Sequence, residues 1–108
     1  MKRRPAANEQ AASASLQALS RALAGLAKAE DVRAFLQDLC TPAELEAMAD
    51  RWRVVPLLLK GVPYREIHDL TEVSVTTIGR VARTLESGTG GYASALRRQQ
   101  SRSSAVSQ

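Results

Sequence analysis

Residues 61–86 constrain the fold of this chain most, because apolar residues recur at helical spacing on both sides of a short polar interruption. Their sequence is GVPYREIHDLTEVSVTTIGRVARTLE. Ile67 and Leu70 stand three residues apart, which predicts a first helix over about residues 64–70 with both side chains on its inward face. The segment therefore begins with a short amphipathic helix.

A second helix is predicted after a turn at Thr71 and Glu72. Ser74 offers a side-chain oxygen as an N-cap, and the helix is expected to continue to about Ser87. The spacing of its apolar residues predicts one inward stripe, made of Ile78, Val81 and Leu85. The remaining faces carry hydroxyls and arginines, with no carboxylate until Glu86: Thr76, Thr77, Arg80 and Arg83.

This pattern is typical of a helix-turn-helix, whose second helix enters the major groove of DNA with its N-terminal residues at the base edges. Hydroxyls bind phosphates or bases, and arginines reach guanine edges or phosphates. We expect the first turn of the second helix to read bases and Arg65 and Arg83 to flank it at phosphates. The predicted DNA-binding residues are Tyr64, Arg65, Ser74, Val75, Thr76, Thr77, Arg80 and Arg83. The alternative is a helical hairpin with a solvated basic face.

Composition indicates one small domain with a modest core, at 108 residues and 11.7 kDa. The net charge of +4 makes an anionic partner plausible. Cys40 is the only cysteine, which excludes an internal disulfide and a multi-cysteine zinc site. No apolar run reaches the ~20 residues of a membrane-spanning helix, so we expect a cytoplasmic chain. Residues 1–8 are predicted to be a flexible basic arm, 9–98 a helical domain, and 99–108 a disordered tail.

Helical periodicity extends over the rest of the domain, so the chain is predicted to be all-α with about six helices. The first two helices are expected over about residues 9–27 and 31–39. The first has only a narrow stripe and needs a partner surface: Leu16, Leu19, Leu23 and Leu26.

The third helix is expected to start after Thr41, with Pro42 in its first turn, and to stop at Gly61. Pro56 should bend it. A last helix is expected over about residues 92–98.

Signatures of an enzyme or a metal site are missing from the sequence. His68, the only histidine, has no serine, cysteine or carboxylate at a spacing that would make it a catalytic base, so a structural role is favoured. Glu44, Glu46 and Asp50 have no histidine or cysteine nearby and are interpreted as a solvated face. We therefore predict no catalytic residue and no metal.

Several segments together resemble the Trp-repressor superfamily, and within it the YerC/YecD-type group of Trp-repressor-related proteins. They are Leu39–Pro42 with Arg51–Trp52, Leu57–Gly61, Tyr64–Ile67, Thr76–Val81 and the Gly-Gly-Tyr of residues 90–92. The resemblance covers about residues 15–97. It implies an intertwined all-helical homodimer with two helix-turn-helix heads, in which the thin N-terminal stripe is buried against the other subunit.

The resemblance also implies a corepressor site. The family's known member binds L-tryptophan through a threonine and two arginines that match Thr41, Arg51 and Arg80 here. Val81, however, stands where that pocket has a glycine, and its branched side chain should intrude on the indole. A different small ligand, or none, is therefore favoured over L-tryptophan, and no cofactor is predicted.

Two further residues depart from the usual motif. Glu72 stands at the turn position where glycine is usual and is expected at positive φ. His68 replaces a small residue. Both are expected to loosen the head or change its angle.

We interpret the chain as a non-enzymatic, sequence-specific regulator, favoured as a repressor, that binds double-stranded DNA as a homodimer. Two alternatives stay open. One is a metabolite-responsive repressor that binds a carboxylate ligand through Thr41, Arg51 and Arg80. The other is a helical dimerisation or adaptor module without DNA binding. The sequence predicts no membrane partner.

Overall fold

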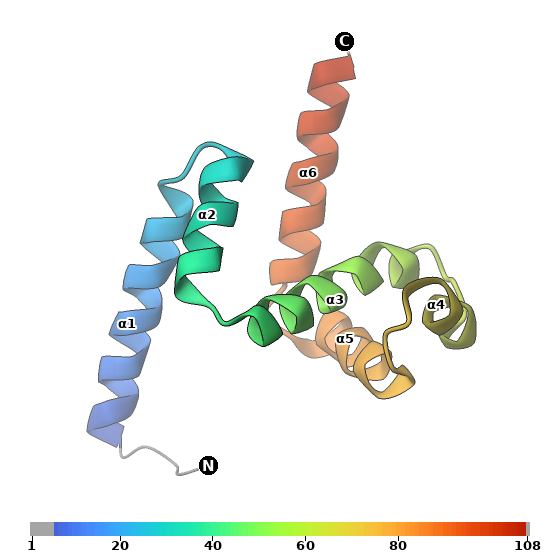
Figure 1. The fold of residues 1–108 in the computed structure, drawn as a ribbon, viewed down its shortest axis with the longest axis horizontal. Helices are drawn as coiled ribbons and strands as arrows, with labels where there is room; N and C mark the ends of the chain where they lie inside the picture. The colour runs from blue at the N-terminus through green and yellow to red at the C-terminus, as the bar shows by residue number, and fades with distance from the viewer. Residues whose placement is uncertain (1–5, 108) are drawn as a thin grey trace. The chain divides into compact units, whose positions relative to one another are not determined.

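The computed structural model describes residues 6–107, and the side chains of residues 8–101, as six α-helices without a strand in that part of the chain. This confirms the predicted all-α class. Helices α1 and α2 belong to one compact unit, and α3 to α6 belong to a second. Figure 1 labels the helices, which are α1 (Ala6–Ala24), α2 (Ala29–Leu39), α3 (Pro42–Leu59), α4 (Tyr64–Thr71), α5 (Val75–Ser87) and α6 (Gly91–Ser107).

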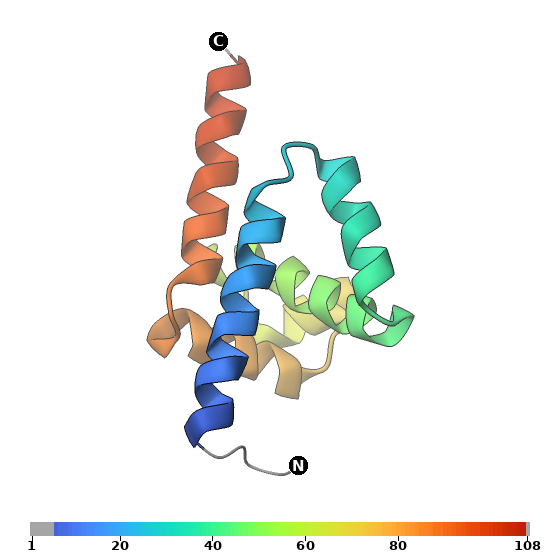
Figure 2. The same ribbon diagram turned by 90° about the vertical axis from the view of Figure 1, so that its left-hand side faces the viewer.

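The first unit is a hairpin of α1 and α2, which run in opposite directions in both views (Figures 1 and 2). Leu19, Leu23 and Leu26 of the predicted stripe are half-buried, whereas Leu16 keeps 64% of its surface exposed. Helix α2 has no buried residue. Within a single chain, the apolar stripe of α1 is therefore incompletely covered.

Two predicted boundaries differ from the structure. Helix α1 spans residues 6–24 rather than 9–27, because Ala6 and Ala7 favour helix and Gly25 ends it. Residues 1–5 of the predicted flexible arm lie outside the described residues. Helix α6 continues to Ser107, where a disordered tail was predicted from residue 99. The sequence after Gly91 contains no further glycine or proline, so nothing local stops the helix.

The core lies in the second unit, where α3, α4 and α5 meet. Its fully buried side chains are Val54 and Val55 of α3, Ile67 of α4, and Ile78 and Val81 of α5. Burying one such side chain contributes about 1.5–3 kcal/mol. The predicted stripe of α5 is thus confirmed, with Leu85 half-buried against the same cluster.

The first turns of α6 complete this unit. Tyr92 and Leu96 pack against the core from outside, and the Tyr92 ring lies 6.4 Å from the Trp52 ring of α3, at 34° between the ring planes. An aromatic pair at this distance and tilt adds about 0.5–1.5 kcal/mol beyond its buried area. Helix α6 is therefore anchored at its N-terminal end.

The prediction that Leu70 faces inward is wrong. Leu70 is 61% exposed, and Thr71 is buried instead at 8% exposure. On a helix, residues three and four positions after Ile67 both lie near its face, and only the placement of the core decides between them. Here the core lies on the side of the fourth residue, and α4 ends with a buried threonine.

The C-terminus of α3 ends as the sequence predicts. Gly61 has φ 79°, the amide of Val62 donates to the carbonyl of Leu57 at 3.1 Å, and the amide of Gly61 donates to that of Leu58 at 3.0 Å. These two bonds form a Schellman motif around a left-handed glycine. The helix continues through Pro56 to Leu59, and the bend predicted at the proline stays a prediction.

The end of α5 requires a glycine for steric reasons. A Cβ on Gly88 would stand 2.5 Å from the carbonyl oxygen of Thr84, whereas a Cβ on Gly91 would meet nothing closer than 4.0 Å. We expect Gly88→Ala to lower the free energy of unfolding by about 1–3 kcal/mol. Gly91→Ala, the matched control, should be neutral or slightly stabilising. Urea denaturation followed by circular dichroism measures both, and equal losses would contradict this account.

Candidate nucleic-acid interface

Helix α5 starts where Ser74 caps it, as the sequence predicts. Ser74 has an extended backbone, and its side-chain oxygen accepts from the backbone amide of Thr77 at 3.1 Å. Its hydroxyl also donates to the Thr77 hydroxyl at 3.0 Å. The cap satisfies an amide that the helix itself leaves without a partner. It therefore fixes the first turn of α5, which carries the predicted base-reading residues.

The turn between α4 and α5 has the backbone expected at Glu72. Its φ is 64°, the one positive φ of a non-glycine residue in the described part of the chain. The Glu72 amide donates to the carbonyl of His68 at 2.8 Å. The ring of His68 lies on the same turn, with Nδ1 2.8 Å from the carbonyl oxygen of Val73. The structural role predicted for His68 is thus to hold the turn.

The first two turns of α5 present the predicted DNA-binding side chains to solvent. Val75 is 51% exposed, Thr76 and Arg80 are exposed, and Thr77 is half-buried. Val75 therefore leaves about half of its apolar side chain free to contact a ligand surface. The start of α5 therefore offers apolar, hydroxyl and cationic groups together.

Gly79 lies where α4 and α5 approach each other on the outer surface. A Cβ placed on Gly79 would stand 3.5 Å from Nη1 of Arg83 and 3.9 Å from Cε2 of Tyr64. Side-chain atoms of Arg83 and Tyr64 thus both lie near Gly79, and Arg65 is exposed next to Tyr64 in the sequence. Sequence reasoning did not assign Gly79 a role in the site, because its role depends on the contact between the two helices.

A pocket of about 280 Å³ lies behind α5 in the second unit. It is lined by Arg51 of α3, Tyr92 of α6, and Arg80, Val81 and Thr84 of α5. Of the three predicted ligand-binding residues, the structure brings Arg51 and Arg80 together here, whereas Thr41 belongs to the first unit. Val81 is 1% exposed and occupies the pocket wall as part of the core. Whether it excludes an indole stays a prediction.

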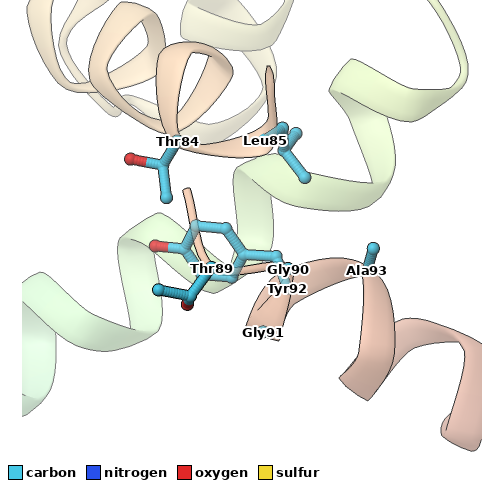
Figure 3. A pocket seen from close by; sticks show the side chains of 7 residues that line it. All are labelled: Thr84, Leu85, Thr89, Gly90, Gly91, Tyr92 and Ala93. Atoms are coloured by element: carbon cyan, nitrogen blue, oxygen red, sulfur yellow. The ribbon is translucent and has the colours of Figure 1, made fainter. Parts of the chain in front are cut away.

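A second hollow of about 260 Å³ adjoins it at the junction of α5 and α6. Figure 3 shows its lining: Thr84 and Leu85 from α5, Thr89, Gly90 and Gly91, and Tyr92 and Ala93 from α6. Thr84 and Tyr92 line both hollows. Sequence reasoning missed these two residues at the pocket. Thr84 could have been found, because it stands one helical turn after Arg80 on the same face.

No group of three or more histidine, cysteine, aspartate or glutamate side chains in the described part of the chain is placed to hold a metal ion. No described helix is long and apolar enough to cross a membrane.

Comparison with known proteins identifies the family. The family model of the Trp repressor protein matches residues 14–100. The chain belongs to the Trp repressor family. Its members are DNA-binding regulators rather than enzymes, and they work as dimers. The resemblance seen in the sequence is thereby confirmed.

Two relatives agree with this assignment. The chain is 36% identical over 83 residues to YerC of Bacillus subtilis (strain 168), an uncharacterized protein, covering 77% of this chain and 80% of YerC. The fold of this chain matches a crystal structure of a candidate Trp repressor from Staphylococcus aureus, with a TM-score of 0.75 and 32% sequence identity. That match covers 81% of this chain and 87% of the other.

The place of Val81 yields a prediction about the pocket. L-Tryptophan should show no measurable heat of binding at micromolar concentration, because the branched Val81 side chain occupies volume at the wall of the pocket that Arg51 and Arg80 also line. Val81→Ala should raise affinity for indole-bearing carboxylates, at a stability cost of about 1–3 kcal/mol from the cavity it leaves. Titration calorimetry on both proteins, with folding checked by circular dichroism, measures this. Micromolar binding of L-tryptophan to the native chain would refute the prediction.

Proposed function

We propose that the chain is a sequence-specific regulator of transcription, acting as a repressor, that binds double-stranded DNA as a homodimer through α4 and α5. The observation that carries this proposal is the start of α5. Its capped N-terminus presents exposed Val75, Thr76 and Arg80, and no carboxylate follows on this helix until Glu86. A helix end of this kind attracts anions, and its side chains fit the major groove.

The exposed residues of the first turn are suited to reading bases. Val75 offers apolar contact to a thymine methyl, and the Thr76 hydroxyl can bond either a donor or an acceptor on a base edge. Thr77 differs from them, because its hydroxyl already accepts from Ser74. We therefore assign base discrimination mainly to Val75 and Thr76, with Arg80 one turn later and Thr77 supporting the cap.

Phosphate contacts are assigned to the flanks of this face. Arg83 is exposed on α5 with its guanidinium near Gly79, and Arg65 is exposed on the first turn of α4. An exposed arginine on this face is available to a phosphate. Such contacts position a protein on the duplex without reading its sequence.

Exposed apolar side chains outside the head support the homodimer. Leu16, Leu39, Met48 and Leu59 are large and exposed in the single chain. The first unit has no buried residue among those described, so its hairpin lacks a core of its own. Two heads in one dimer would contact two half-sites about one helical turn apart on the DNA.

A ligand-responsive regulator is the second candidate, favoured by the pocket between Arg51 and Arg80. Two arginines that line one pocket suit a small carboxylate or other anion, while the Thr84 hydroxyl donates its proton to the carbonyl of Arg80 at 3.1 Å. A panel of carboxylates that raises the melting temperature would support this reading, because a ligand that binds the native state stabilises it. The alternative of a helical dimerisation or adaptor module instead predicts that the chain binds no DNA, not even a random duplex at low salt.

Substitutions at base-reading and phosphate-binding residues should have different effects on DNA affinity. The test first selects an operator from a random duplex pool. Arg83→Ala should weaken operator and scrambled duplex similarly and reduce the salt slope by about 0.9 per lost phosphate contact. Thr76→Ala should lower the ratio of operator to scrambled affinity, since each lost base contact is worth about 1–3 kcal/mol. Titrations of both variants on both duplexes at two salt concentrations measure the contrast.

Arg33→Ala on α2 is the control for this experiment, because it removes the same charge from an exposed position outside the head. It should leave the operator ratio unchanged. If Arg83→Ala collapsed the ratio while Thr76→Ala left it untouched, our assignment of base and phosphate contacts would be wrong.

The homodimer should depend on Leu16. This side chain is exposed in the single chain, so Leu16→Glu should leave the fold of one chain intact. If the partner buries Leu16, the substitution should weaken the dimer by at least about 1.5–3 kcal/mol. Gln17→Glu, which adds the same charge at the next exposed position, is the control. Sedimentation equilibrium measures both, and an unchanged dimer in Leu16→Glu would count against this interface.

A further inference from the structure

Two side chains of α4 hold the turn that leads into α5, and both bond to the backbone of one residue, Val73. Val73 directly precedes the N-cap Ser74, and its own side chain is buried in the core. Its backbone amide and its backbone carbonyl are both bonded to side chains of α4. The segment that leads into α5 is thus tied to α4 through both backbone groups of a single residue.

Thr71 holds the amide of Val73. Its hydroxyl donates to the carbonyl of Ile67 at 2.7 Å and accepts from the amide of Val73 at 3.1 Å. A hydroxyl has one proton to donate, and here that proton is committed while a lone pair receives the amide. Because Thr71 is buried, water cannot readily replace either bond.

His68 holds the carbonyl of Val73. The carbonyl oxygen can only accept, so the hydrogen bond at 2.8 Å requires that Nδ1 carry the proton. Nδ1 is therefore the donor in the neutral ring, and the charged ring would donate in the same way. His68 lies on α4 one turn before Glu72, whose amide bonds to the His68 backbone.

This arrangement differs from the ordinary hydroxyl bonds of the molecule. Ser20 and Ser87 also donate to the carbonyl four residues earlier, at 2.8 Å and 3.0 Å, but both are exposed and neither accepts a second backbone amide. Thr71 is buried, and its hydroxyl bonds both α4 and the segment before α5. Its backbone carbonyl accepts a hydrogen bond from Nη1 of Arg53 on α3, at 3.4 Å. The contacts at Thr71 therefore join α3, α4 and the start of α5.

We propose that Thr71 and His68 are positioning residues for DNA reading: by holding both backbone groups of Val73, they fix the direction in which α5 is presented. The proposal rests on the proposed DNA-binding function. Neither side chain needs to touch DNA. Glu72 adopts a left-handed conformation that persists only where the surroundings determine it, and these two bonds supply that determination.

The test compares paired variants that remove or keep each bond. Thr71→Val removes the hydroxyl at nearly constant shape, and Thr71→Ser restores it. His68→Ala removes the donor, and His68→Asn places an amide nitrogen at the position of Nδ1. Ser87→Ala removes an exposed hydroxyl from α5 and is the control. Each protein is titrated on a selected operator and on scrambled duplex, at a temperature where circular dichroism shows it fully folded.

We expect Thr71→Val and His68→Ala to lower the ratio of operator to scrambled affinity about tenfold, with scrambled binding nearly unchanged, since a tilted helix loses base contacts but keeps its charge. Thr71→Ser and His68→Asn should recover most of the ratio, and Ser87→Ala should keep it. A lower melting temperature with an unchanged ratio in both removal variants would overturn the positioning role and leave only a structural one.

The experiment also separates this proposal from the function on which it rests. A native chain that binds neither duplex at low salt would overturn the DNA-binding function itself. Native binding with a clear operator preference that none of the folded removal variants reduces would overturn only the positioning role. Because His68 is exposed, its alanine variant should fold even if Thr71→Val does not.

Discussion

The rest of the structure depends on the packing of five β-branched side chains where α3, α4 and α5 meet. Val54, Val55, Ile67, Ile78 and Val81 are fully buried there. Branching at Cβ leaves each of these side chains few rotamers in a helix, so little side-chain freedom is lost when they are buried. The same stiffness means that small changes in helix direction cannot be absorbed by rotation of the side chains. The core therefore fixes the angle between α4 and α5, which is the quantity that a DNA-reading head has to control.

Val81 shows how the core and the candidate ligand pocket compete for one position. Its side chain is buried in the core and also lines the pocket that contains Arg51 and Arg80. A smaller residue would enlarge the pocket but leave a cavity beneath α5, at a cost that grows with the volume left empty. The chain fills this volume itself. Because Val81 fills the core beneath α5, the position of α5 does not depend on a ligand in the pocket. This is consistent with a regulator that binds DNA in the absence of a corepressor.

Features set by neighbouring residues could be predicted from the sequence, and those set by distant contacts could not. The Ser74 cap and the Gly61 stop depend on hydrogen bonds within a few residues, and both are present. The burial of Thr71 in place of Leu70 depends on where α3 lies, which helical spacing cannot decide. Arg51 and Arg80 were paired only through the family resemblance. The bond from His68 to Val73 requires the left-handed turn to be formed first, so no spacing rule could reveal it.

The two departures from the usual motif, Glu72 and His68, compensate each other. A non-glycine residue in the left-handed region is disfavoured by about 1–2 kcal/mol, yet the turn keeps this backbone because Thr71 and His68 bond the residue that follows it. A glycine would permit the same conformation but also many others, since it restricts the backbone least. Side-chain bonds instead select one conformation. The direction of α5 thus follows from specific contacts on α4 rather than from the freedom of a flexible residue, so substitutions on the inner side of the motif can alter recognition without touching the DNA.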